Sequence, residues 1–298
     1  MEMADFKKRL QENIPGDFYV DSRCINCGNC RELAPGVFGD SGRYAYVKSQ
    51  PRNATERREA LQALIACPVA AIGSRNSDRR PVMGDFPMPI EDTVSYCGFN
   101  SAESYGGSSY FIEHPHGNWL VDSPRFVPHL IKRFETLGGL RYIFLTHKDD
   151  VAESEEYARH FKAERIIHEA DRIAAPTAEI LLRGTSPVEL VPGFKIIPVP
   201  GHTKGHCVLL YKEKFLFTGD HLEWNPEENS LGAYRDYCWY DWQEQTRSME
   251  KLLPFRFEWV LPGHGHRHRG TVQQMRAEVQ RLVEKMKQPA VSYLSERL

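Results

Sequence analysis

Residues 200–206 read PGHTKGH, and they follow the apolar run FKIIPVP of residues 194–200. A glycine turn and two histidines after an apolar run place imidazole side chains where a strand ends, and site residues concentrate at such loop edges. Three more fragments have the same setting, THKDD at 146–150, TGDH at 218–221 and PGHGH at 262–266. Because histidine and aspartate are common metal ligands, the four fragments together predict a metal site built from several strand ends.

The sequence around these fragments alternates short apolar runs with longer helical patterns. We expect strands at residues 108–114, 118–122, 141–147, 194–200, 207–213 and 214–220. We expect helices at residues 125–137, 152–163 and 271–287. The last of these places one apolar face on Val272, Met275, Val279, Leu282 and Met286. Strands mixed with helices predict a layered α/β domain with its site at the loop edge.

The four fragments, in this order and spacing, resemble the metallo-β-lactamase fold, an αββα sandwich, over residues 93–298. In that family a His-x-His-x-Asp-His run supplies ligands to two metal ions. A later histidine serves the first ion, an aspartate bridges the two, and a final histidine serves the second. The resemblance assigns these roles, in order, to His147 as the first histidine, His202, Asp220 and His264.

The opening run departs from the family pattern at three positions. Asp149 stands where the second histidine belongs, Val151 where the aspartate belongs and Ala152 where the next histidine belongs. Valine and alanine cannot bind a metal, so the second ion keeps too few ligands for a closed site. We therefore expect a single metal ion held by His147, Asp149, His202 and Asp220, with His264 as a further candidate.

The two adjacent aspartates have a second interpretation. Asp149 and Asp150 precede a helical pattern, where aspartate is favoured as a helix cap, and the scaffold could then be free of metal. If the extended backbone continues past Thr146, Asp149 points the same way as His147. Asp150 then faces elsewhere and begins the helix.

Four of the seven cysteines lie in the first quarter of the chain. Residues 24–30 read CINCGNC, and Cys67-Pro68 supplies one more thiol. Three thiolates two residues apart can surround one iron–sulfur cube, and Gly28 allows the tight turn. The alternative is zinc, but zinc sites favour two separated cysteine pairs. We expect Cys24, Cys27, Cys30 and Cys67 to be the cluster ligands.

Residues 15–73 resemble the single-cluster bacterial-type ferredoxins. The resemblance rests on the cysteine run, on RELAPGVF and YAYV after it, and on NATERREALQALIACPVAAI. It implies a [4Fe-4S] cluster, because all four cysteines are present. In the last segment Asn53 is predicted to cap a helix, with Glu56 three residues on, and Leu61, Leu64 and Ile65 are predicted to face inward.

The expected organisation of the 298 residues is a ferredoxin-like iron–sulfur domain at 1–74, a linker at 75–92 and a metallo-β-lactamase domain at 93–298. The fold class is thus a small α+β domain followed by an α/β sandwich. A net charge of −2 gives no electrostatic case for nucleic acid or an acidic membrane as partner. No apolar run approaches the roughly 20 residues of a membrane span, and the N-terminal residues lack the apolar core of a secretory signal, which favours the cytoplasm.

Three functions are compatible with these features. The first is a redox enzyme, in which the cluster exchanges electrons with a single non-haem metal acting on a small molecule or dioxygen. Two histidines and a carboxylate suit Fe(II), and a cluster beside a redox-silent metal would have nothing to reduce, so iron is favoured over zinc. The second is a single-metal hydrolase of an ester, thioester or phosphoester with a structural or sensing cluster. The third is a non-catalytic electron carrier or binding protein that docks a redox partner.

Overall fold

The computed structural model describes residues 4–76 and 80–288. Residues 1–3, 77–79 and 289–298, which belong to the predicted N-terminal domain, linker and C-terminal domain, lie outside the described residues. The chain forms two compact units. Unit 1 consists of Met1–Arg183 with Gly263–Gly265, and unit 2 consists of Gly184–Pro262 with His266–Leu298.

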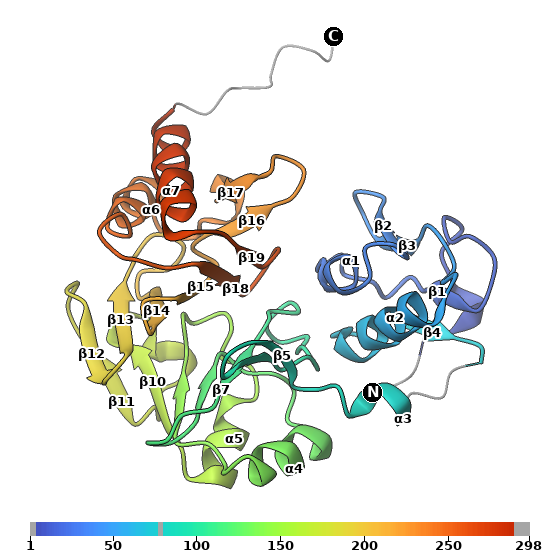
Figure 1. Cartoon of the computed structure of the whole chain (residues 1–298), viewed down its shortest axis with the longest axis horizontal. Coiled ribbons are helices and arrows are strands. Elements are labelled where there is room, and N and C mark those ends of the chain that lie inside the picture. Colours follow the sequence, from blue (N-terminus) through green and yellow to red (C-terminus); the bar gives the residue numbers. More distant parts are fainter. Residues whose placement is uncertain (1–3, 77–79, 289–298) are drawn as a thin grey trace. The chain divides into compact units, whose positions relative to one another are not determined.

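The N-terminal part of unit 1 is a small α+β arrangement, drawn in blue in Figure 1. Two antiparallel strand pairs form it, β1 (Phe18–Val20) with β4 (Ile72–Ser74) and β2 (Phe38–Asp40) with β3 (Ala45–Val47). Its helical elements are η1 (Phe6–Lys8), α1 (Asn29–Leu33) and α2 (Ala54–Ala66). Helices α1 and α2 contact each other, so the cysteine run and Cys67 are brought to one place.

Helix α2 begins as its sequence predicts. The side chain of Asn53 accepts a hydrogen bond from the backbone N–H of Glu56 at 2.9 Å, which satisfies one of the free donors of the first turn. Leu61, Leu64 and Ile65 are buried. The predicted cap and the predicted inward face are both confirmed.

The rest of unit 1 is built on a seven-stranded sheet of order β11-β10-β9-β8-β7-β6-β5. Its strands are β5 (Met88–Glu91), β6 (Val94–Tyr96), β7 (Tyr110–Ile112), β8 (Trp119–Val121), β9 (Tyr142–Phe144), β10 (Glu164–His168) and β11 (Ile180–Leu182). Strands β8, β9 and β10 run parallel, so their carboxyl ends meet at one edge. That edge carries Asp122 after β8 and His147 after β9.

Helices on this sheet match the predicted positions. They are α4 (Pro128–Thr136) and α5 (Ser154–Phe161). Two shorter elements are α3 (Arg80–Met83), which contacts α2, and η2 (Glu169–Ala174), which contacts β10 and β11. Phe134 of α4 stacks on Phe111 of β7 with ring centroids 4.7 Å apart. Strand β5 and helix α3 both lie within residues 75–92, the range predicted as a linker, and β5 pairs with β6 at the edge of the sheet.

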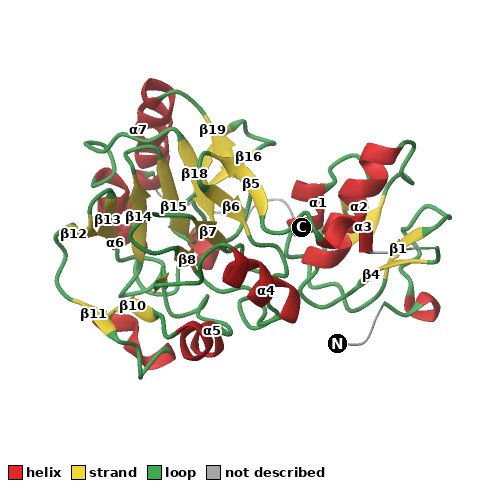
Figure 2. Cartoon of the chain, turned by 60° about the horizontal axis from the view of Figure 1, so that its bottom comes forward, coloured by secondary structure: helices red, strands yellow, loops and turns green. Residues whose placement is uncertain are grey.

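Unit 2 is built on a six-stranded sheet of order β12-β13-β14-β15-β18-β19, seen in yellow in Figure 2. Its strands are β12 (Val188–Val191), β13 (Phe194–Pro198), β14 (Cys207–Tyr211), β15 (Phe215–Gly219), β18 (Trp259–Pro262) and β19 (His268–Arg269). A separate hairpin is formed by β16 (Glu223–Asn225) and β17 (Ser230–Gly232). PGHTKGH is therefore the connection from β13 to β14, and Asp220 follows β15.

Two helices, α6 (Trp242–Glu250) and α7 (Val272–Lys287), and the short η3 (Arg235–Tyr237) complete unit 2. Thr271 and Gln274 form a reciprocal capping box at the start of α7. The apolar face of α7 packs into a buried cluster with side chains of β13, β14, β15 and β18. Of the predicted inward face, Met275, Val279, Leu282 and Met286 are buried in this cluster, whereas Val272 at the start of the helix is half-buried.

Candidate metal centres

The four N-terminal cysteines surround one cavity in unit 1. Its lining includes Cys24, Cys27, Cys30 and Cys67 together with apolar side chains such as Val20. Gly28 adopts φ +89° directly before α1, in the left-handed region that glycine tolerates, and so turns the chain between Cys27 and Cys30. Cys67 ends α2 as its C-cap. The sequence alone predicted this convergence.

The environment of these thiols suits a polycationic cluster. Burial is the main cause that raises the pKa of Cys27 to about 11; the neighbouring thiols Cys67 and Cys24 add to this value, and hydrogen bonds from Asn29 oppose it. Burial also raises the pKa of Cys30 and of Cys67. Buried thiolates crowded in this way need a compensating positive charge, which cluster iron supplies. The donor set therefore fits a four-cysteine iron–sulfur cluster.

N–H groups donate hydrogen bonds to the sulfurs of Cys24, Cys27 and Cys67. The backbone N–H of Asn26 donates to Cys24 Sγ at 3.4 Å, and that of Ala71 donates to Cys67 Sγ at 3.2 Å. The side-chain amide of Asn29 donates to Cys27 Sγ at 3.4 Å. Hydrogen bonds to the sulfurs are one of the means by which a protein sets a cluster's reduction potential.

The histidine at the end of β9 is held by a polar chain within unit 1. Thr146 donates its backbone N–H and its hydroxyl to Oδ1 of Asp122, at 2.8 and 3.0 Å. The same hydroxyl lies 2.9 Å from Nδ1 of His147. Because the hydroxyl hydrogen is given to Asp122, Oγ1 accepts from a protonated Nδ1, and Nε2 of the buried His147 keeps the lone pair that a metal requires.

The two aspartates after His147 differ in their surroundings. Oδ2 of Asp149 lies 3.9 Å from Nε2 of His147, and its side chain is 39% exposed beside the ammonium of Lys148. Asp150 is only 2% exposed. The prediction that Asp150 begins the helix is wrong, because α5 starts at Ser154 with Glu153 as its N-cap. Asp150 is instead a candidate metal ligand, because one of its carboxylate oxygens has the spacing to share an ion with His147 and Asp220.

Unit 2 contributes a cluster of imidazoles around Asp220. Nε2 of His202 lies 3.6 Å from Oδ2 of Asp220. The backbone N–H of Asp220 donates to Nε2 of His206 at 3.1 Å, so His206 orients the aspartate's backbone. Burial lowers the pKa of His221 to about 3, with a smaller contribution from His202, so this ring is neutral. The roles of His202 and Asp220 as metal ligands stay predictions, whereas the contact of His206 with Asp220 was not predicted from the sequence.

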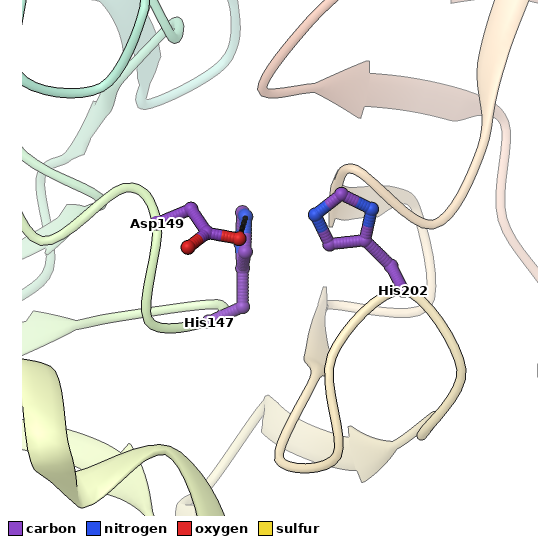
Figure 3. Close-up of side chains that lie close together, drawn as sticks. All are labelled: His147, Asp149 and His202. Atoms are coloured by element: carbon purple, nitrogen blue, oxygen red, sulfur yellow. Dashed lines mark ion pairs between the residues drawn. The ribbon is translucent and has the colours of Figure 1, made fainter. Parts of the chain in front are cut away.

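Two sets of these side chains have the spacing to hold a metal ion. One is His147, Asp149 and His202, drawn in Figure 3, and the other is His147, Asp150 and Asp220. Within each set, one ligand atom per residue lies within 4.8 Å of the others. Two imidazoles and carboxylates suit one divalent transition-metal ion. Val151 and Ala152 offer no donor atom, so the opening run lacks two of the ligands that a second ion would need.

His264 and Glu153 stand apart from both sets. Nε2 of His264 lies 3.1 Å from the carbonyl oxygen of Ser104 in unit 1, so His264 as a metal ligand stays a prediction. Glu153 accepts a hydrogen bond from Ser101 Oγ at 3.2 Å, and burial raises the pKa of its carboxyl.

No helix of the described residues is long and apolar enough to cross a membrane.

Comparison with protein families identifies both parts of the chain. Residues 20–74 match the family described as the 4Fe-4S single cluster domain of Ferredoxin I. Residues 88–280 match the metallo-beta-lactamase superfamily. The expected fold class, a ferredoxin-like iron–sulfur domain followed by a metallo-β-lactamase sandwich, is thereby confirmed. No curated protein matches the chain.

Solved structures of metallo-β-lactamases are similar to this chain. DIM-1 metallo-beta-lactamase is 18% identical over 65% of this chain and 95% of its own, with a TM-score of 0.50. The metallo-beta-lactamase from Pontibacter korlensis is 18% identical over 65% of this chain and 97% of its own, with a TM-score of 0.48. FIM-1 from Pseudomonas aeruginosa, in its mono-zinc form, is 19% identical over 67% of this chain and 95% of its own, with a TM-score of 0.49. At 18% identity the likeness to DIM-1 concerns the fold alone.

Proposed function

This chain belongs to the metallo-β-lactamase superfamily, and from that premise we propose that it is a redox enzyme in which the ferredoxin domain exchanges electrons with a single metal ion. The ion acts on a small molecule or dioxygen. Its ligands are His147, Asp149, His202 and Asp220, with Asp150 and His264 as further candidates. Iron is the proposed metal.

The observation that carries the proposal is the combination of donors in the two sets. Val151 and Ala152 remove two metal-binding positions of the family's opening run, which supports one ion in place of two. Asp149 replaces an imidazole by a carboxylate, so the remaining set approaches the arrangement of two histidines and one carboxylate that non-haem Fe(II) adopts. When bound, such an ion would change its oxidation state and offer an open position to a ligand.

The protein's own residues prepare this site. Asp122 and Thr146 fix the tautomer of His147, and His206 holds the backbone of Asp220. Ligands held by such outer contacts bind metal more tightly than ligands left free to rotate. The ferredoxin domain supplies one-electron chemistry, which a hydrolase does not need. Its presence therefore favours a redox function over a hydrolytic one.

An aromatic segment next to His202 supports a small-molecule substrate. Tyr234, Tyr237, Trp239 and Tyr240 are exposed, and the ring of Trp239 lies 6.2 Å from that of His202. The backbone N–H groups of Trp239 and Tyr240 both donate to the carbonyl oxygen of His202, which ties the segment to the ligand loop. We propose that these rings face the substrate.

We also propose that a separate redox partner protein reduces the cluster. Four cysteines placed as cluster ligands support a reducing compartment such as the cytoplasm.

Metal quantitation tests the proposal. Full-length protein purified without oxygen should contain one iron beyond the four of the cluster, measured by elemental analysis, acid-labile sulfide and Mössbauer spectroscopy. His202→Ala should lose only the additional iron, whereas His116→Ala, at an exposed turn, should lose none. One equivalent of zinc in place of iron would favour the hydrolase, and no metal beyond the cluster would favour the non-catalytic carrier. Two ions in the second domain would overturn the single-metal assignment.

A further inference from the structure

A pair of glycines in unit 1 touches a cluster cysteine on one side and a candidate metal ligand on the other. Gly106 packs against Cys27 so closely that a Cβ at position 106 would lie 2.9 Å from Cys27 Cβ and 3.1 Å from Cys27 Sγ. Gly107 packs against Asp150, and a Cβ there would lie 3.0 Å from each carboxylate oxygen. One dipeptide thus spans the distance between the two metal-binding regions.

The contact on the cluster side is reinforced by hydrogen bonds. The side-chain amide of Asn29 donates to the carbonyl oxygen of Gly106 at 2.6 Å and also to Cys27 Sγ at 3.4 Å. The hydroxyl of Tyr105 donates to the carbonyl oxygen of Ile25 at 2.6 Å. Asn29 is buried, so its bond to Gly106 is shielded from water.

The segment that carries the two glycines is also hydrogen-bonded to residues 263 and 264, which belong to unit 1. The backbone N–H of Ser108 donates to the carbonyl oxygen of Gly263 at 2.7 Å, and the ring of His264 lies against the carbonyl oxygen of Ser104. Asn100 holds the carbonyl oxygen of Gly106 from within, through its side-chain amide at 2.7 Å. The segment from Asn100 to Ser109 is therefore a fixed connection with bonds at both ends.

We propose that Gly106 and Gly107 form the electron route between the [4Fe-4S] cluster and the metal ion of the second domain. The route runs from Cys27 Sγ through the backbone of the two residues to the carboxylate of Asp150. This inference rests on the proposed redox function and names the path that it uses. Glycine allows the close approach at both positions, because a Cβ at position 106 would press against Cys27 and a Cβ at position 107 would press against the carboxylate of Asp150.

The electron balance of the step is simple. The reduced cluster loses one electron, and the ferric ion gains it and becomes ferrous, with no bond formed or broken. A low-potential one-electron donor of the ferredoxin or flavodoxin type restores the reduced cluster. Transfer rates fall steeply when a contact in the path is lengthened, so the packing of Gly106 on Cys27 controls the rate.

The test compares Gly106→Ala with Gly42→Ala in full-length protein loaded with cluster and ferric iron. Both glycines have φ in the left-handed region, +91° and +83°, so both variants carry the same backbone strain. Only Gly106 has Cys27 within reach, because a Cβ at Gly42 would meet nothing within 4 Å. After flash photoreduction of the cluster, its reoxidation is followed optically, and the ferric signal is followed by freeze-quench EPR.

The cluster of the unaltered protein and of Gly42→Ala should reoxidise at the same rate, and that of Gly106→Ala at least several-fold more slowly. Protein carrying zinc in place of iron should keep its cluster reduced. Tyr105→Phe removes one docking bond from an exposed ring, so it tests the same contact should Gly106→Ala fail to fold, and it should slow reoxidation to a smaller extent. Equal rates in all variants would overturn the route but leave the redox function standing. No reoxidation in the unaltered iron-loaded protein would overturn the redox function itself.

Discussion

The hydroxyl of Thr146 lies 2.9 Å from Nδ1 of His147 while it donates to the carboxylate of Asp122. This arrangement joins the ends of the parallel strands β8 and β9 into a single support for one imidazole. The support fixes which nitrogen of His147 is available to a metal, although Thr146 itself touches no metal.

Thr146→Val should therefore weaken metal binding while it preserves the cluster. Loss of a residue that orients a metal-binding histidine costs roughly 10–100-fold in metal affinity. Competition with a chromophoric chelator measures this change. Thr136→Val is the control, because the hydroxyl of Thr136 donates to the carbonyl oxygen of Lys132 on the surface of α4, away from the candidate ligands. Unchanged affinity in Thr146→Val would show that the ring is oriented by other contacts.

The cysteine assignment predicts a selective loss of colour. Cys27→Ser or Cys67→Ser should bleach the brown chromophore, because four thiolates surround the cavity and none of the other three cysteines lines it. Cys238→Ser should leave the absorption and the iron content unchanged, since Cys238 donates to the carbonyl oxygen of Gly201 in unit 2. A full four-iron signal in both ligand variants would contradict the assignment.

The two aspartates should respond similarly to substitution. Asp149→Ala and Asp150→Ala should each reduce the content of the additional metal, because each carboxylate belongs to one of the two candidate ligand sets. Asp150→Ala should not weaken the start of α5, which Glu153 precedes. Metal content and helix stability by hydrogen exchange measure the two effects, with the exposed Asp236→Ala as control. Full metal retention in Asp150→Ala would leave Asp149 as the ligand of the pair.

Asn29 should influence the cluster potential. Asn29→Leu removes an N–H···S bond to Cys27, and hydrogen bonds stabilise the more negative, reduced cluster. A hydrogen bond worth about 0.5–1.5 kcal/mol corresponds to a decrease of roughly 20–60 mV for one electron. Spectroelectrochemistry measures the potential. Asn29→Gln, which keeps an amide donor, should shift it less, and an equal shift in both variants would point to packing as the cause.

The sequence by itself determined the elements whose information is local. The spacing of CINCGNC and the cap at Asn53 act over a few residues, and the runs before His147, His202 and Asp220 mark strand ends by their apolar pattern alone. The resemblance then predicted that the strand ends share a site. These features could be read from the chain because a turn, a cap or a strand depends on its immediate neighbours.

Only the tertiary structure decided the contacts between residues that are far apart along the chain. The bond from Asn29 to Gly106 crosses 77 residues, and nothing in the glycine pair itself indicates which side chains will fill the space around it. Asp150 has the sequence context of a helix cap, yet packing against Gly107 buries it. A local pattern shows which roles a residue type is suited to. Which role it takes depends on its burial, and burial depends on every neighbour in space.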